Sequence, residues 1–231
     1  MSPQTSTTWP SVTNRASEAE PLYRRALEID EKSHGPEHPD VAVDLNNLAQ
    51  LLQATNRFGE AEPLMRRALA IDEKNFGPEH PKVAIRLNNL AMLLKATNRL
   101  GDAEPMMRRA LAIDEKSYGS DHPAVGMDVG NLAGLLSGLG RFEEAEPLRR
   151  RELKIIEGAF EGNHPHVATA LNNLAGLLRA TNRLGEAEPL VRRALAISEA
   201  SFGLDHPTTQ LYGQNLAALE AELGGGRDRV S

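Results

Sequence analysis

The sequence has no cysteine and few aromatic residues, and these shortages exclude whole classes of protein. None of its 231 residues is cysteine and 4% are aromatic. The lack of cysteine excludes disulfide bonds and thiol chemistry and fits a reducing compartment. No apolar run approaches the roughly 20 residues of a membrane-spanning helix, and the opening MSPQTSTTWPSVTNRAS lacks the basic start and apolar core of a secretory signal. We therefore expect a cytoplasmic protein with no membrane partner.

An excess of basic charge and recognisable catalytic motifs are also missing. The formal net charge is −6, which disfavours a general nucleic-acid or acidic-membrane surface. The sequence shows no glycine-rich phosphate loop, no defensible Ser–His–Asp arrangement and no paired carboxylates on an apolar face. We expect no enzyme, no catalytic residue and no cofactor.

A repeat of 42 residues is what the sequence does contain. The tripeptide AEP begins at Ala19, Ala61, Ala103, Ala145 and Ala187, and HP recurs in step at His38, His80, His122, His164 and His206. Residues 19–60 and 61–102 share 31 identities in 42 positions. Self-similarity at this period indicates a solenoid of stacked units.

Each repeat carries two helical patterns. The first, near 40–55, has the apolar stripe Val41, Leu45, Leu48 and Leu52; the second, near 60–76, has the stripe Ala61, Leu64, Ala68 and Ile71. Pro39 suits the first position of a helix, and Asn56 suits the left-handed conformation that ends one. Pro63 suits the first turn of the second helix. Neither helix can bury its stripe alone, so the units must stack into an all-α fold.

The boundaries follow from the repeat. We expect a disordered segment 1–16, a solenoid 17–223 and a flexible tail 224–231. Within the solenoid we expect an unpaired first helix 17–34, units 40–77, 82–119, 124–161 and 166–203, and an unpaired last helix 207–223.

The motif GPEHPDVA…LNNLA…AEPL.RRAL.I resembles the tetratricopeptide repeat (TPR) of the kinesin light chain-like type, and the resemblance covers roughly residues 18–223. It implies a right-handed α-solenoid of antiparallel helix pairs. In that family the first helix of each unit lines a concave groove that binds extended peptides. Cargo and motor attachment do not carry over, because the chain lacks a heptad-repeat segment.

The repeated asparagine pairs are candidate peptide contacts. They lie off the apolar stripe, and an amide both donates and accepts, as the main chain of an extended peptide does. Alternatively they bond neighbouring helices, or each pair does both. The predicted groove residues are Asn46, Asn47, Gln50, Arg86 (at the margin), Asn88, Asn89, Met92, Lys95, Asn131, Asn172, Asn173 and Arg179. We expect a protein or peptide partner, acidic with an apolar anchor.

The third unit departs from the pattern. Gly126, Gly130, Gly134 and Gly138 fall on one helix face, and Glu152 stands where the other repeats have alanine. Each glycine in a helix costs about 0.5–1 kcal/mol relative to alanine. Decay of the repeat is one explanation; a hinge, or a bare patch that a ligand backbone approaches, is the other.

Histidines and arginines recur, but we expect neither metal binding nor a phosphate track. The HP histidines of successive units are separated by at least a helix-packing distance, about 8–10 Å, too far to share a metal, and they suit helix starts. In every second helix a glutamate precedes the first of two arginines by four residues, which favours solvated ion pairs.

The two unpaired end helices suggest a second function. The last helix of one copy and the first of another would complete a unit, giving head-to-tail assembly. We therefore predict a peptide-binding scaffold and, as the alternative, a self-assembling structural array.

Overall fold

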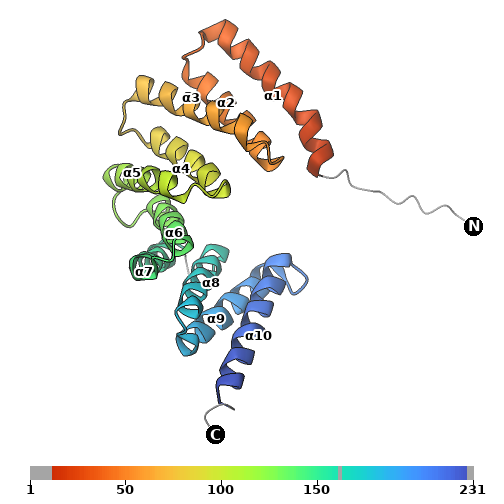
Figure 1. The fold of residues 1–231 in the computed structure, drawn as a ribbon, viewed down its shortest axis with the longest axis vertical. Coiled ribbons are helices and arrows are strands. Elements are labelled where there is room, and N and C mark those ends of the chain that lie inside the picture. The colour runs from red at the N-terminus through yellow and green to blue at the C-terminus, as the bar shows by residue number, and fades with distance from the viewer. Residues whose placement is uncertain (1–11, 161–162, 228–231) are drawn as a thin grey trace, which may run out of the picture. The chain divides into compact units, whose positions relative to one another are not determined.

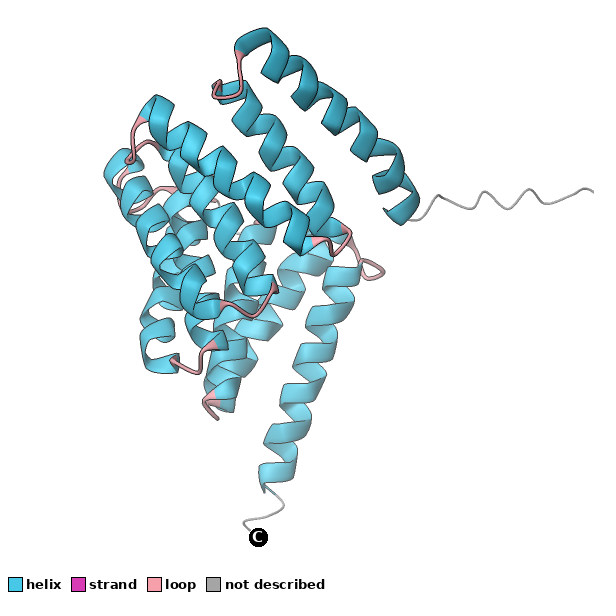
Figure 2. Ribbon diagram, turned by 45° about the horizontal axis from the view of Figure 1, so that its top comes forward, coloured by secondary structure: helices cyan, strands magenta, loops and turns pink. Residues whose placement is uncertain are grey.

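A computed structural model of the chain describes residues 12–160 and 163–227. In this described part every regular element is an α-helix, joined to the next by a short loop (Figures 1 and 2). The helices are α1 (Val12–His34), α2 (Pro39–Ala54), α3 (Phe58–Phe76), α4 (Pro81–Ala96), α5 (Leu100–Tyr118), α6 (Pro123–Gly138), α7 (Phe142–Ala159), α8 (Pro165–Ala180), α9 (Leu184–Phe202) and α10 (Pro207–Arg227). The predicted all-α fold is confirmed.

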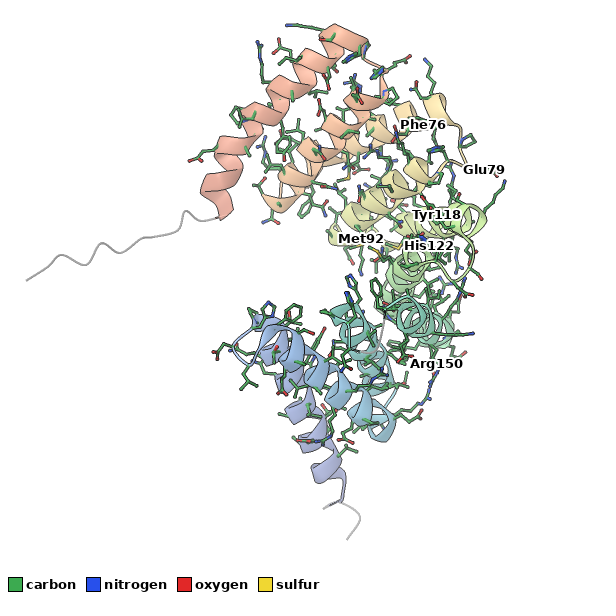
Figure 3. All side chains as sticks on the ribbon, turned by 180° about the vertical axis from the view of Figure 1, so that it is seen from behind. Phe76, Glu79, Met92, Tyr118, His122 and Arg150 are labelled. Carbon is green, nitrogen blue, oxygen red and sulfur yellow. The ribbon has the colours of Figure 1, made fainter. Side chains whose placement is uncertain are left out.

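The HP dipeptides start the first helix of each repeat, as predicted. His80 is the N-cap of α4, and its Nδ1 accepts the backbone N–H of Lys82 at 3.2 Å. The ring also stacks on Phe76, the last residue of α3, with the centroids 4.8 Å apart. Tyr118 and His122 repeat the arrangement at 4.6 Å (Figure 3). Cap and stack together explain why these histidines recur every 42 residues.

Left-handed residues end the first helices. Asn56, Asn98 and Asn182 have φ values of 61°, 60° and 59°, and Gly140 takes the same place in the third repeat with φ 73°. Asparagine and glycine tolerate this conformation better than other residues do. The stop predicted at Asn56 is confirmed.

Several boundaries differ from the prediction. α3 begins at Phe58, so Pro63 lies beyond the first turn, where a proline removes one helical hydrogen bond. α1 begins at Val12, inside the predicted disordered segment, and α10 continues to Arg227, inside the predicted tail. The rest of these two segments, 1–11 and 228–231, lies outside the described residues.

The chain forms two compact units, residues 1–110 and 111–231, and α5 runs across their boundary. In the first unit Val41, Ala42 and Leu45 of α2 pack with Ala68 and Ile71 of α3. In the second, Val167, Ala168 and Leu171 of α8 pack with Ala194 and Ile197 of α9. These contacts join the two helices of one repeat. The second cluster also includes Ile156 of α7 and Tyr212 of α10, so it joins one repeat to the next.

Ion pairs line the second helices, as predicted. Each first arginine binds the glutamate four residues earlier, at 2.6–2.8 Å in Arg24–Glu20, Arg66–Glu62, Arg108–Glu104, Arg150–Glu146 and Arg192–Glu188. The glutamates also reach the next repeat: Arg57 binds Glu20, and Arg183 binds Glu146, both at 2.6 Å. The Arg57 and Arg24 hydrogen bonds lower the pKa of Glu20. These arginines hold successive repeats together in each unit.

Candidate functional site

Large apolar side chains stay exposed on the first helices of the repeats. We call the first-helix face the exposed side of α2 and α4 in the first unit, and of α6, α8 and α10 in the second. Val43 and Ile85 are 44% and 53% exposed, and Met127 and Leu211, at the same repeat position, are 65% and 49% exposed. Met92 on α4 is also exposed (Figure 3). Exposed apolar side chains repeated at one position are typical of a binding surface.

The asparagine pairs bridge neighbouring first helices. Asn89 Nδ2 donates to Asn46 Oδ1 at 2.8 Å, and Asn215 Nδ2 donates to Asn172 Oδ1 at 2.9 Å. In both cases the first asparagine of one repeat accepts from the second asparagine of the next. Each bridge uses one donor and one acceptor, and an amide has further capacity for both. The bridges therefore fix the stacking of neighbouring first helices, and the second asparagines are partly exposed.

The other predicted groove residues vary in exposure. Gln50 is exposed on α2, whereas Asn47, Asn88, Lys95, Asn131 and Asn173 are half-buried on their helices. Arg86 is not on the exposed face at all. It is 8% exposed, and its Nε donates to Asp72 Oδ2 of α3 at 2.7 Å. The predicted role of Arg86 at the groove margin is wrong, because the side chain turns inward to neutralise a buried carboxylate.

A small cavity opens on the first-helix face of the second unit. It measures about 90 Å³ and is lined by Asn172, Ala175, Gly176, Arg179, Val191, Asn215 and Leu219. Gly176 stands where α2 and α4 carry Gln50 and Met92, and a Cβ there would meet no atom within 4 Å. The missing side chain keeps the cavity open between α8 and α10. Arg179 at its edge binds Glu222 of α10.

The third repeat replaces the asparagine bridge with a buried carboxylate. Gly130 stands where the other repeats have the first asparagine, and a Cβ there would lie 2.5 Å from Glu152 Oε1. The Glu152 carboxylate instead accepts from Asn173 and from Arg149 Nη1, the latter at 2.7 Å. Burial raises the pKa of Glu152, and Arg149 and Asn173 act in the opposite direction.

Gly126 is explained in the same way. A Cβ there would lie 3.0 Å from Ile155 and 3.1 Å from Ile156, and Ile156 takes the place of an aspartate in the preceding repeats. Gly126 and Gly130 therefore make room for larger side chains of α7. Neither decay nor a hinge is needed for these two glycines.

Buried acidic residues join the second helix of one repeat to the first helix of the next. Asp72 pairs with Arg86, as above, whereas Asp114 hydrogen-bonds to Asp128 at the same two repeat positions. Asp114 and Asp128 are 6% and 3% exposed. Burial raises the pKa of Asp114, because desolvation disfavours the charged form, and the Asp128 hydrogen bond and the His122 charge act in the opposite direction. Sequence reasoning missed these pairs, although a polar residue recurring inside an apolar stripe was a usable signal.

The first-helix face offers groups that can bind a ligand. Apolar side chains, amides and Arg179 are suited to holding a chain segment. Among the described helices, none combines the length and apolar character needed to cross a membrane.

The tetratricopeptide repeat sequence profile matches residues 13–74, 60–116, 88–148 and 126–200. A comparison with curated protein sequences gives no match.

Solved structures give the same picture. A putative kinesin light chain with nearly identical TPR-like repeats from Podosopora anserina is 25% identical over 82% of this chain and 90% of its own, with a TM-score of 0.69. BtubC (BKLC) from P. vanneervenii is 28% identical over 84% of this chain and 77% of its own, with a TM-score of 0.73. YrrB, a TPR protein with an unusual peptide-binding site, is 18% identical over 88% and 86% of the two chains, with a TM-score of 0.53, and shows the fold alone. The chain belongs to the tetratricopeptide repeat family and is of the kinesin light chain-like kind.

Proposed function

We propose that the first-helix face of each unit binds an extended peptide segment of a partner protein, without catalysis. The observation that carries the proposal is the exposure of apolar side chains at one repeat position, Val43 and Ile85 in the first unit and Met127 and Leu211 in the second, on the helices that carry the asparagine bridges. Apolar anchors supply affinity and amides pair with main-chain groups. A cytoplasmic location remains a prediction.

The cavity beside Arg179 supports a finer proposal about the partner. Its walls include Ala175, Val191 and Leu219, and its volume is about 90 Å³, which suits one aliphatic side chain better than an aromatic ring. Arg179 already binds Glu222, so an acidic residue of the peptide takes over an existing ion pair. We propose a peptide with an aliphatic anchor beside an acidic residue.

A peptide-display selection on the purified chain tests the binding face. We expect enriched peptides whose affinity falls about tenfold or more, roughly 1.4 kcal/mol, in Ile85→Glu and Met127→Glu, since a carboxylate at either position removes an exposed apolar contact. Leu204→Glu is the control, because Leu204 is 71% exposed in a loop outside this face. Failure to enrich any peptide, or equal losses in the control, would overturn the proposal.

The alternative, self-assembly through the end helices, has one observation in its favour. Leu22 and Ile29 of α1 are 71% and 47% exposed, whereas Ile71, at the repeat position of Ile29, is 5% exposed. The same selection separates the two functions, because assembly through α1 does not depend on Ile85 or Met127.

A further inference from the structure

Three metal-ligating side chains meet at the corner between α1 and α2. One ligand atom each of His34, His38 and Asp40 lies within 4.8 Å of the other two, and these form the one such group found among the described residues. His34 is the last residue of α1, His38 is the N-cap of α2, and Asp40 lies in the first turn of α2. All three side chains are 40% or more exposed to solvent, so an ion reaches them without any opening of the fold.

The other corners of the chain serve as internal controls. At the position of His34 they carry Phe76, Tyr118, Phe160 and Phe202, and at the position of Asp40 they carry Lys82, Ala124, His166 and Thr208. In the next corner Lys82 lies over the Phe76 ring, 4.2 Å from its centroid. In that corner the Lys82 ammonium group covers an aromatic ring. In the first corner the two equivalent positions carry His34 and Asp40, which are both possible metal ligands.

The distances fit a small ion. A tetrahedral zinc ion holds its nitrogen and oxygen ligands at about 2.0–2.2 Å, which places two ligand atoms about 3.3 Å apart. His38 Nδ1 and Asp40 Oδ2 are 3.4 Å apart, so two ligands already stand at this spacing. The His34 ring stacks on His38 with centroids 4.7 Å apart, and one of its nitrogens lies within 4.8 Å of the other two ligand atoms.

The surrounding groups favour a cation. Asp30 Oδ1 lies 3.8 Å from His34 Nδ1, too far for a hydrogen bond but close enough to add negative charge beside the site. Asp44 hydrogen-bonds to Asp30, where the next corner has Arg86 against Asp72. The metal must replace the cap hydrogen bond of His38, since a neutral imidazole has one acceptor nitrogen. That bond is 3.3 Å long, at the weak end of the range.

We propose that His34, His38 and Asp40 bind one divalent transition-metal ion of the zinc class. Two imidazoles and a carboxylate leave one position for water or for a group of a partner. The bound ion links the end of α1 to the start of α2. Because it binds the folded corner, it stabilises the first unit by an amount that grows with the logarithm of the free metal concentration above the dissociation constant.

Titration calorimetry of the full chain with zinc chloride, after tag removal and treatment with a chelator, tests the site. We expect saturation at one ion per chain and a rise in the thermal midpoint. His34→Phe, which copies the next corner, should weaken binding at least about tenfold. Asp40→Lys, which copies the same corner, should do so too, and the absorption bands of tetrahedral cobalt(II) should disappear in both.

His166→Ala is the matched control. His166 lies beside His164, with ring centroids 4.9 Å apart, and alanine stands at its position in the preceding corner. We expect this variant to bind zinc like the parent. No saturable binding, binding unchanged in both His34→Phe and Asp40→Lys, or an equal loss in His166→Ala would each overturn the proposal. Circular dichroism of each variant confirms that it is folded.

Discussion

At the scale of single residues, departures from the repeat pattern compensate each other. Gly130 lacks the asparagine of the other repeats, and Glu152 fills the space and accepts from Asn173. A buried carboxylate against Arg149 thus takes the place of an amide bridge such as Asn46–Asn89. Both solutions give the half-buried second asparagine of the next repeat a hydrogen-bond acceptor.

A double-mutant cycle tests this matching. Gly130→Asn alone should destabilise the chain by about 1–3 kcal/mol through overpacking against Glu152. Glu152→Ala alone should cost a similar amount, since Asn173 loses its acceptor and Arg149 its partner. The double variant carries the two residue types that the next repeat has at these positions, Asn172 and Ala194. We therefore expect a favourable coupling energy of about 0.5–3 kcal/mol in urea unfolding. Arg149 is unchanged in all four proteins, so the loss of its partner cancels in the coupling energy. An additive result would therefore contradict the expectation that residues 130 and 152 are matched to each other.

At the scale of helices, pairs of buried ionisable side chains join one repeat to the next. In the first unit Arg86 of α4 neutralises Asp72 of α3. In the second unit Asp114 of α5 meets Asp128 of α6, and His122 is the positive group that acts on Asp114 when protonated. The α5–α6 junction is therefore sensitive to pH in a way that the α3–α4 junction is not.

The Asp114→Asn variant should expose this sensitivity. Burial raises the pKa of Asp114 in the folded chain, so its contribution to stability is fully present below the ordinary aspartate value of about 3.9 and is lost as the pH rises through the folded value. Asparagine stays neutral and can donate to Asp128. We expect the variant to be more stable than the parent at pH 7, with the difference shrinking towards pH 4.

Urea unfolding at several pH values measures the effect. Asp121→Asn is the control, because Asp121 is exposed in the neighbouring loop, and its difference from the parent should vary less with pH. A stability difference for Asp114→Asn that stays constant from pH 4 to pH 7 would refute the explanation.

At the scale of the whole chain, the two end helices differ in their surfaces. α1 exposes Leu22 and Ile29. α10 carries Gln210, Gly213 and Glu220 where α2, α4 and α8 have alanine, leucine and leucine, and Glu220 binds Arg192 at 2.9 Å. α10 thus has the polar surface of a solenoid cap. Head-to-tail assembly needs two apolar faces, and the described residues provide one.

Self-association should therefore depend on α1. We expect sedimentation equilibrium at high concentration to show a mass above that of the monomer, which Leu22→Glu combined with Ile29→Glu returns to the monomer value. Ala217→Glu on the exposed side of α10 should have no effect. A monomer at every concentration, or equal sensitivity to the α10 substitution, would contradict this expectation.

Features that depend on spacing along the chain were predictable from the sequence. The same local signals occur in every repeat, and they identify the 42-residue period, the two helices per repeat, the HP helix starts and the Arg–Glu pairs. Helix caps and pairs four residues apart involve groups within one turn of each other, so the sequence alone was sufficient to identify them. The resemblance to the tetratricopeptide repeat rested on the same periodic signal.

Only the tertiary structure decided which side chains from different helices face each other. Asn46 and Asn89 are 43 positions apart, Arg86 turns inward to Asp72, and Glu152 reaches over Gly130. The expectation of no metal site compared histidines of successive repeats and did not pair His34 with His38, which belong to different repeat positions. Periodicity identifies the face of a helix, but the packing of neighbouring helices determines its contacts, because these depend on the size and charge of both partners.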